Sequence, residues 1–166
     1  MKKVLIVEDE ILARLGLRQL VDWRKLELEL LPDATDGEEA LEMIRNSCPD
    51  IILLDLNIPK VSGLEILEFL KKEEMPTKVI VVSCQEEFDV VKKAMKLGAY
   101  DYLRKLNLSS DELENILEKC LVETEERITV HMQGIREIRY EEIVRDSRDT
   151  VSYTHLRAHE TSLHLV

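Results

Sequence analysis

Five side chains capable of metal or phosphoryl chemistry stand at the ends of short, largely aliphatic segments. Glu8 and Asp9 follow the run VLIV, Asp55 follows IILL, Ser83 lies in VVSC, and Lys105 ends DYLRK. Three carboxylates brought together repel one another unless they are protonated or bind a cation, and their hard oxygens suit Mg²⁺. A hydroxyl and an ammonium group beside them would bind phosphoryl oxygens. The pattern predicts a site for a divalent metal and a phosphoryl group together.

Each of these residues also has an ordinary structural interpretation. Any one of the acids could cap a turn or face solvent. Ser83 could be the N-cap of a helix, and Lys105 could be a solvated lysine. The metal-site interpretation requires all five side chains to meet at one place, which depends on the elements that carry them.

The spacing of aliphatic residues predicts strands that alternate with helices. Short aliphatic runs bounded by turn residues predict strands at residues 4–7, 30–34, 51–54, 79–82 and 100–103. Three- and four-residue spacing predicts helices at residues 11–21, after an Asp36 cap, at 63–72, at 88–97 before Gly98, and after a Ser109 or Ser110 cap.

This alternation predicts an α/β fold with helices on both faces of a parallel sheet. A flavodoxin-like, doubly wound, five-stranded sheet in the order 2-1-3-4-5 is the natural arrangement at this length. In that order the first and third strands are neighbours, so Glu8, Asp9 and Asp55 should meet at their carboxyl ends. The site residues would then share one edge of the sheet.

Composition restricts the class of protein. A chain of 166 residues with a net charge of −11 and a sequence pI near 4.9 would repel nucleic-acid phosphates, so we expect no direct nucleic-acid binding. The three cysteines lack CxxC spacing, which argues against a disulfide framework and a zinc site. No segment has the length of a signal peptide core or a membrane span, so we expect a cytoplasmic protein that does not contact the membrane.

The segments VLIVEDE, LLDLNIPKVSGLE, VVSC and GAYDYLRK, in this order, resemble the receiver domain of bacterial two-component response regulators. The resemblance covers roughly residues 2–121. It implies that Asp55 is the phosphoacceptor, which takes a phosphoryl group from a sensor histidine kinase. It also implies a Mg²⁺ site formed by Asp9, Asp55 and the backbone carbonyl of Asn57, with Glu8 beside them. Such a domain is a signalling module and not an enzyme, apart from its own phosphorylation and slow dephosphorylation.

The resemblance also implies a conformational switch. Lys105 would pair with one phosphoryl oxygen and Ser83 would hydrogen-bond another, while Tyr102 would be the aromatic residue that turns inward. A simple core tyrosine is the alternative for Tyr102. Phosphorylation would bias the face formed by the fourth helix, fifth strand and fifth helix, through which the domain could form a homodimer or contact a partner.

Two positions depart from the family pattern. Many receivers have two aspartates where this chain has Glu8 and Asp9, and the longer glutamate would change how a metal-bound water is held. Leu106 follows Lys105 where the family commonly has a proline joined by a cis bond. A cis bond before a non-proline residue costs about 2.5–4 kcal/mol, so we expect a trans bond and a different local loop.

Two segments within the first 122 residues suggest that the receiver belongs to a longer protein. VDWRKLELELLPDATDGEEAL and CQEEFDVVKKAMKLGAYDYL resemble the YesN-type subgroup, in which a receiver precedes an AraC-type helix-turn-helix transcription domain. We therefore expect a receiver at residues 1–122 and a helical linker stub at 123–150, solvated or weakly dimerising, truncated before its effector. Residues 151–166 begin VSYTHLRAHET, which is one reading frame of a common transposon sequencing adapter, and we expect this tail to be non-native.

Two other functions remain open on these residues. A stand-alone receiver would act in a phosphorelay or by binding a protein, without an attached transcription domain. A Mg²⁺-dependent phosphohydrolase would use Asp55 as nucleophile, but haloacid-dehalogenase-like enzymes need an acid two residues later, where this chain has Asn57.

Overall fold

The protein forms a parallel five-stranded sheet in the order β2-β1-β3-β4-β5, as predicted. The computed structural model describes residues 1–84 and 87–123. The strands are β1 (Lys2–Val7), β2 (Leu28–Leu30), β3 (Ile51–Leu54), β4 (Lys78–Ser83) and β5 (Asp101–Arg104). The central strands are buried on both faces, which explains their continuous aliphatic runs.

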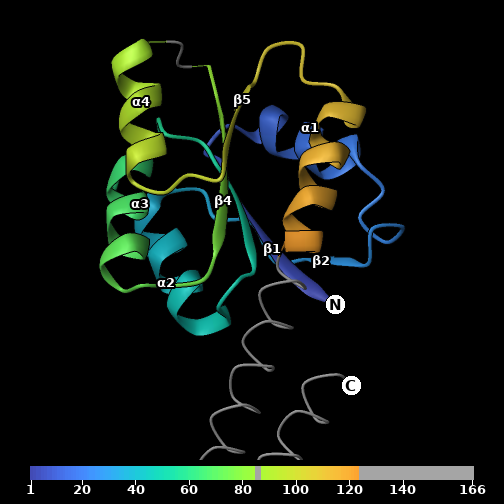
Figure 1. Cartoon of the computed structure of the whole chain (residues 1–166), viewed down its shortest axis with the longest axis horizontal. Coiled ribbons are helices and arrows are strands. Elements are labelled where there is room, and N and C mark those ends of the chain that lie inside the picture. Colours follow the sequence, from blue (N-terminus) through green and yellow to red (C-terminus); the bar gives the residue numbers. More distant parts are fainter. Residues whose placement is uncertain (85–86, 124–166) are drawn as a thin grey trace, which may run out of the picture. The chain divides into compact units, whose positions relative to one another are not determined.

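Helices cover both faces of the sheet (Figure 1). They are α1 (Ile11–Leu20), α2 (Gly37–Ser47), α3 (Gly63–Lys72) and α4 (Phe88–Lys96), and residues 110–123 are also helical. Figure 1 shows α2, α3 and α4 on one side of the sheet, with α1 and the helix that begins at residue 110 on the other. This doubly wound arrangement confirms the predicted fold class.

Helix boundaries follow the capping residues. The Asp36 carboxylate accepts the Glu39 N–H at 2.9 Å and caps α2. Gly98 follows Leu97, the C-cap of α4, and has a left-handed φ of +96°, a conformation that glycine adopts without strain. The Ser109 hydroxyl accepts the Glu112 N–H at 3.2 Å and caps the last helix. The predicted stops and starts at Asp36, Gly98 and Ser109 are therefore present.

The second strand was predicted at the wrong residues. The sequence predicts a strand at residues 30–34, whereas β2 covers Leu28–Leu30. The Leu31 N–H still donates to the Val4 carbonyl, but the next donor is Ala34 to the Ile6 carbonyl, one residue later than a regular parallel ladder requires, so the regular pairing ends near Leu30. Only single contacts continue beyond it, including a bridge between Val7 and Ala34. The other strands begin and end within two residues of their predicted limits.

Helix α1 leaves much of its apolar surface uncovered. Leu17 is buried, but Ile11, Leu12 and Leu15 are 63%, 76% and 48% exposed. At 100° per residue these three side chains lie on the side of the helix opposite Leu17. They therefore do not form a single apolar stripe together with Leu17. The helical spacing predicted the element correctly but did not separate its covered and uncovered faces.

The structure also bears on the predictions about the cysteines, membrane spans and the C-terminal segments. Cys48, Cys84 and Cys120 are all free, in agreement with the absence of a disulfide framework. Within residues 1–84 and 87–123, no helix combines the length and apolar character required to span a membrane. The predicted linker at 123–150 lies outside the described residues except for residue 123, and so does the whole tail at 151–166.

Candidate functional site

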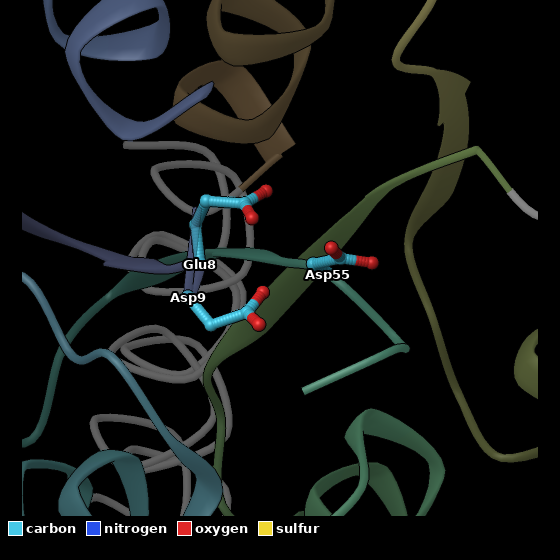
Figure 2. Close-up of side chains that lie close together, drawn as sticks. All are labelled: Glu8, Asp9 and Asp55. Carbon is cyan, nitrogen blue, oxygen red and sulfur yellow. The ribbon is translucent and has the colours of Figure 1, made fainter. Parts of the chain in front are cut away.

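Three carboxylates meet at the carboxyl edge of the sheet. Val7 of β1 is paired with Leu54 of β3, so the residues that follow these strand ends are neighbours. Oxygens of Glu8, Asp9 and Asp55 lie within 4.8 Å of one another. Figure 2 shows the carboxylates of Glu8 and Asp9 both turned toward the side on which Asp55 lies. The predicted meeting of the three acids is thus present in the structure.

Lys105 reaches this acid cluster from the end of β5. Its Nζ lies 2.6 Å from Glu8 Oε2 and donates to Asp55 Oδ2 at 3.0 Å. The Lys105 backbone N–H also donates to the Ser83 carbonyl at 3.1 Å, which extends the β4–β5 pairing by one residue. The ammonium group therefore bridges two acids, one directly after β1 and the other directly after β3.

Glu8 is the most deeply buried member of the cluster. It is 1% exposed, its Oε1 accepts the Glu10 N–H at 3.0 Å, and its Oε2 faces Lys105. Burial raises the pKa of Glu8, and the contacts with Lys105 and Glu10 oppose this effect. Both oxygens of Glu8 thus have partners within the protein, whereas Asp9 is exposed.

Asp55 is held by its own loop and by Lys105. It is 6% exposed, and its Oδ1 accepts the Asn57 N–H at 3.1 Å. Burial lowers the pKa of Lys105, but the contacts with Glu8 and Asp55 outweigh burial and raise this pKa above its usual value. Lys105 is therefore protonated at neutral pH and supplies one positive charge to the three acids.

The remaining predicted residues surround this cluster. Ser83 is 1% exposed at the end of β4, and Asn57 is exposed after Asp55. Tyr102 lies in β5, is partly buried and packs against the core cluster. Leu106 is 65% exposed, and no peptide bond among the described residues is cis, which agrees with the trans bond expected at Leu106.

An open cavity of about 780 Å³ lies beside the acid cluster and Lys105. Its lining consists of Asp9, Glu10, Asp55, Asn57, Ser83, Cys84, Glu87 and Lys105. The sequence patterns did not indicate Glu10, Cys84 or Glu87. Cys84 adjoins Ser83 in VVSC, so adjacency was the one available signal for it, while Glu10 and Glu87 resemble any exposed acid in the sequence.

The donor set fits a hard divalent cation. Asp9 and Asp55 offer carboxylate oxygens to one open cavity, and Asn57 also lines it. Oxygen ligands with room for water are what Mg²⁺ prefers. One ammonium beside three acids leaves a net negative charge, so a cation would relieve the remaining repulsion.

Removal of the Lys105 ammonium should lower stability most at high pH. Lys105→Met leaves buried Glu8 and Asp55 facing each other without a cation, which should cost about 1–3 kcal/mol near pH 7. The pKa of Glu8, already above 4.5, should then rise further. In Lys105→Met the native state then keeps a proton on Glu8 at pH values where Glu8 of the unfolded chain has lost it. The free energy of unfolding of this variant therefore falls as the pH rises from the unfolded pKa of Glu8 to its folded pKa.

Denaturant unfolding from about pH 5 to pH 8 measures this effect, as the deficit of Lys105→Met relative to the wild type. The deficit should increase with pH. Lys60→Met is the control, because Lys60 is exposed and solvent screens its ion pair with Asp36, so the substitution should change stability little at any pH. A deficit that does not change with pH would contradict the proposed pairing of charges.

Comparisons with known proteins agree with this geometry. Residues 4–118 match the family described as the response regulator receiver domain. The chain is 33% identical over 118 residues to an uncharacterized response regulatory protein of Staphylococcus epidermidis, covering 71% of this chain and 46% of that protein. It is 30% identical over 141 residues to the uncharacterized transcriptional regulatory protein YesN of Bacillus subtilis, covering 85% of this chain and 38% of YesN.

A solved structure supports the same assignment. The receiver domain of AraT, a response regulator from Geobacillus stearothermophilus, superposes with a TM-score of 0.69 at 31% identity, covering 76% of this chain and 97% of that one. The chain spans less than half the length of the first curated relatives, 46% in each case. The match over residues 4–118 and the shared fold lead to one conclusion. The chain belongs to the response regulator receiver domain family, the phosphoacceptor domain of two-component signalling.

Proposed function

We propose that Asp55 is the residue of this chain that accepts a phosphoryl group from a sensor histidine kinase. The observation that carries the proposal is the convergence of Asp55, Asp9 and Lys105 at one open cavity. An Asp55 carboxylate oxygen attacks phosphorus, a P–O bond forms and the P–N bond to the kinase histidine breaks. The released imidazole nitrogen takes a proton.

The neighbouring residues stabilise the transferred group by position and charge. Lys105 Nζ, now 3.0 Å from Asp55 Oδ2, is placed to pair with a phosphoryl oxygen, and Ser83 lines the same cavity. Asp9, Asp55 and the Asn57 carbonyl would hold Mg²⁺, with Glu8 beside them. When bound, this ion supplies positive charge that offsets the charge of the phosphoryl group.

The switch proposed for this domain follows from the same contacts. A phosphoryl group on Asp55 adds negative charge that needs new partners, and Ser83 and Lys105 lie on the loops after β4 and β5. Movement of these loops would bias the face formed by α4, β5 and the helix that begins at residue 110, with Tyr102 on β5 as the aromatic switch residue. This change would alter how the face binds a second copy of the chain or a partner protein. A homodimer could also form through the linker.

We further propose that residues 1–122 act as the receiver of a longer cytoplasmic transcription regulator. The similarity to YesN over 141 residues supports this wider context. In it the receiver would control an AraC-type DNA-binding domain and would not itself turn over a substrate. A stand-alone receiver would lack such a domain, and the full gene distinguishes the two.

The direct test is incubation of the protein with Mg²⁺ and a small phosphodonor such as phosphoramidate. Intact-protein mass spectrometry should show the gain of one phosphoryl group, and chelation of the metal should prevent it. Slow loss of the group without turnover of excess donor would separate this function from a phosphohydrolase. Failure of the wild-type protein to gain a phosphoryl group would contradict the proposal.

Mg²⁺ should also raise the melting temperature of the unphosphorylated protein. A ligand that binds the native state alone stabilises it by about 2.7 kcal/mol at a hundredfold excess over its dissociation constant. Asp9→Asn should remove most of this rise because it removes the exposed carboxylate of the cluster. Glu29→Gln, on the exposed side of β2, is a charge-matched control that should keep it. An equal rise in both variants would show that the metal binds elsewhere.

A further inference from the structure

A guanidinium group contacts the turn that carries two of the acids. Arg14, in the first half of α1, donates from one terminal nitrogen to the carbonyl of Glu8 at 3.0 Å and to that of Asp9 at 3.1 Å. Its backbone N–H donates to the Glu10 carbonyl at 3.0 Å. Arg14 thus binds three successive carbonyls in the turn between β1 and α1.

Two of these carbonyls, those of Glu8 and Asp9, have no donor within α1. Glu10 is the N-cap of α1, so its carbonyl is the first to accept a bond from within the helix. The carbonyls of Glu8 and Asp9 precede the cap and receive no helical N–H. Arg14 supplies that donor, and it fixes the peptide units from which both carboxylates extend.

Arg14 is itself held from the other side. Its Nε lies 3.8 Å from Asp33 Oδ2, and Arg18 Nη1 lies 2.6 Å from Asp33 Oδ1. The Arg14 and Asp33 side chains are only 17% and 16% exposed. A planar guanidinium with donors in two directions can connect the acid-bearing turn to the loop after β2, which a lysine cannot do in the same way.

We propose that Arg14 is a positioning residue for the metal site, which acts through the backbone of Glu8 and Asp9. This inference rests on the proposed function of the acid cluster. Residues that orient metal ligands typically change metal affinity by about 10- to 100-fold when they are replaced. Arg14→Gln should therefore weaken Mg²⁺ binding by about 10-fold.

The sign of the effect separates positioning from charge. Loss of a positive charge near a cation site should strengthen cation binding by Coulomb interaction alone. Arg18→Gln is the matched control, since it removes the same charge one turn further along α1 and also loses a contact with Asp33. Arg18 contacts Asp33 and the Leu31 carbonyl, away from the carbonyls of the acids. Positioning thus predicts weaker binding in Arg14→Gln, and unchanged or slightly tighter binding in Arg18→Gln.

The experiment is calorimetric titration of Mg²⁺ into the wild type, Arg14→Gln, Arg14→Lys and Arg18→Gln, with thermal unfolding of each protein in chelator. Arg14→Lys keeps the charge and can donate to a carbonyl, so it should recover part of the affinity. If Arg14→Gln does not fold, Arg14→Lys takes its place in the comparison with Arg18→Gln, and its Mg²⁺ affinity should lie below that of the wild type. Equal dissociation constants for the Arg14 and Arg18 variants, at equal metal-free stability, would overturn the inference.

A metal-free measurement keeps this test distinct from that of the proposed function. Carbonyl ¹³C shifts of Glu8 and Asp9 should change in Arg14→Gln and remain close to the wild type in Arg18→Gln. If the wild type binds no Mg²⁺, the proposed metal site fails, whatever these shifts show. If the wild type binds Mg²⁺ but the carbonyl shifts do not respond to Arg14→Gln, the positioning role of Arg14 fails alone.

Discussion

Asp55→Asn should abolish the gain of one phosphoryl group from phosphoramidate and Mg²⁺. The amide has nearly the same shape as the carboxylate, and it can still accept the Asn57 N–H that now bonds to Asp55 Oδ1. It lacks the anionic oxygen that attacks phosphorus, so the reaction loses its nucleophile while the loop keeps its conformation. Intact-protein mass spectrometry gives the extent of phosphorylation directly.

The same strand offers a control for Asp55→Asn. Asp50 precedes β3, at the opposite end from Asp55, and its side chain accepts the Lys3 N–H at 2.8 Å. Asp50→Asn changes the charge by the same amount and should leave phosphorylation at the wild-type level. Full phosphorylation of Asp55→Asn would place the acceptor on another residue, and loss in both variants would indicate a general defect.

The sequence predicted the acid cluster because strand ends are marked locally, and because the alternation of strands and helices indicated the strand order. A continuous run such as IILL before Asp55 identifies a buried parallel strand, and the order 2-1-3-4-5 makes it the neighbour of β1. Because β1 and β3 are parallel neighbours, the residues at their carboxyl ends, Glu8, Asp9 and Asp55, lie close together. The same argument placed Ser83 and Lys105 at this edge, and both line the cavity.

Contacts that depend on side-chain reach were not predictable in this way. No spacing rule places Lys105 Nζ 2.6 Å from Glu8 as well as 3.0 Å from Asp55, because that depends on the loop after β5. The contact of Arg14 with the carbonyls of residues 8 and 9 depends on how α1 leaves the sheet. For Ile11 and Leu12, helical spacing gave the element but not the exposed side.

The loop after Asp55 is also fixed by packing that the sequence does not reveal. Gly37 begins α2, and its N–H donates to the Pro59 carbonyl at 3.1 Å. Lys60, with a left-handed φ of 71°, places its Nζ 2.9 Å from Asp36 Oδ2 beside Gly37. These contacts connect the start of α2 to the loop that leads from the proposed phosphoacceptor to α3.

Gly37→Ala should destabilise the protein by about 3 kcal/mol, because an added methyl group has no space at this contact. A Cβ on residue 37 would lie 1.9 Å from the Val61 carbonyl oxygen, which is backbone and can move only if the loop moves. The melting temperature should fall by about 10 °C, and phosphorylation should slow because the displaced loop carries Asp55 at its start. Trp23, the single tryptophan, is 7% exposed, so its fluorescence can follow unfolding.

Gly16→Ala makes the same chemical change where nothing opposes it. Gly16 lies within α1, and no atom would lie within 4 Å of its added Cβ. Alanine in an exposed helix interior should stabilise the protein by about 1 kcal/mol relative to glycine. The two substitutions should therefore shift stability in opposite directions. A similar small change in both would mean that the α2 contact with the Asp55 loop yields easily, and that this loop is not held as closely as the distances at Gly37 require.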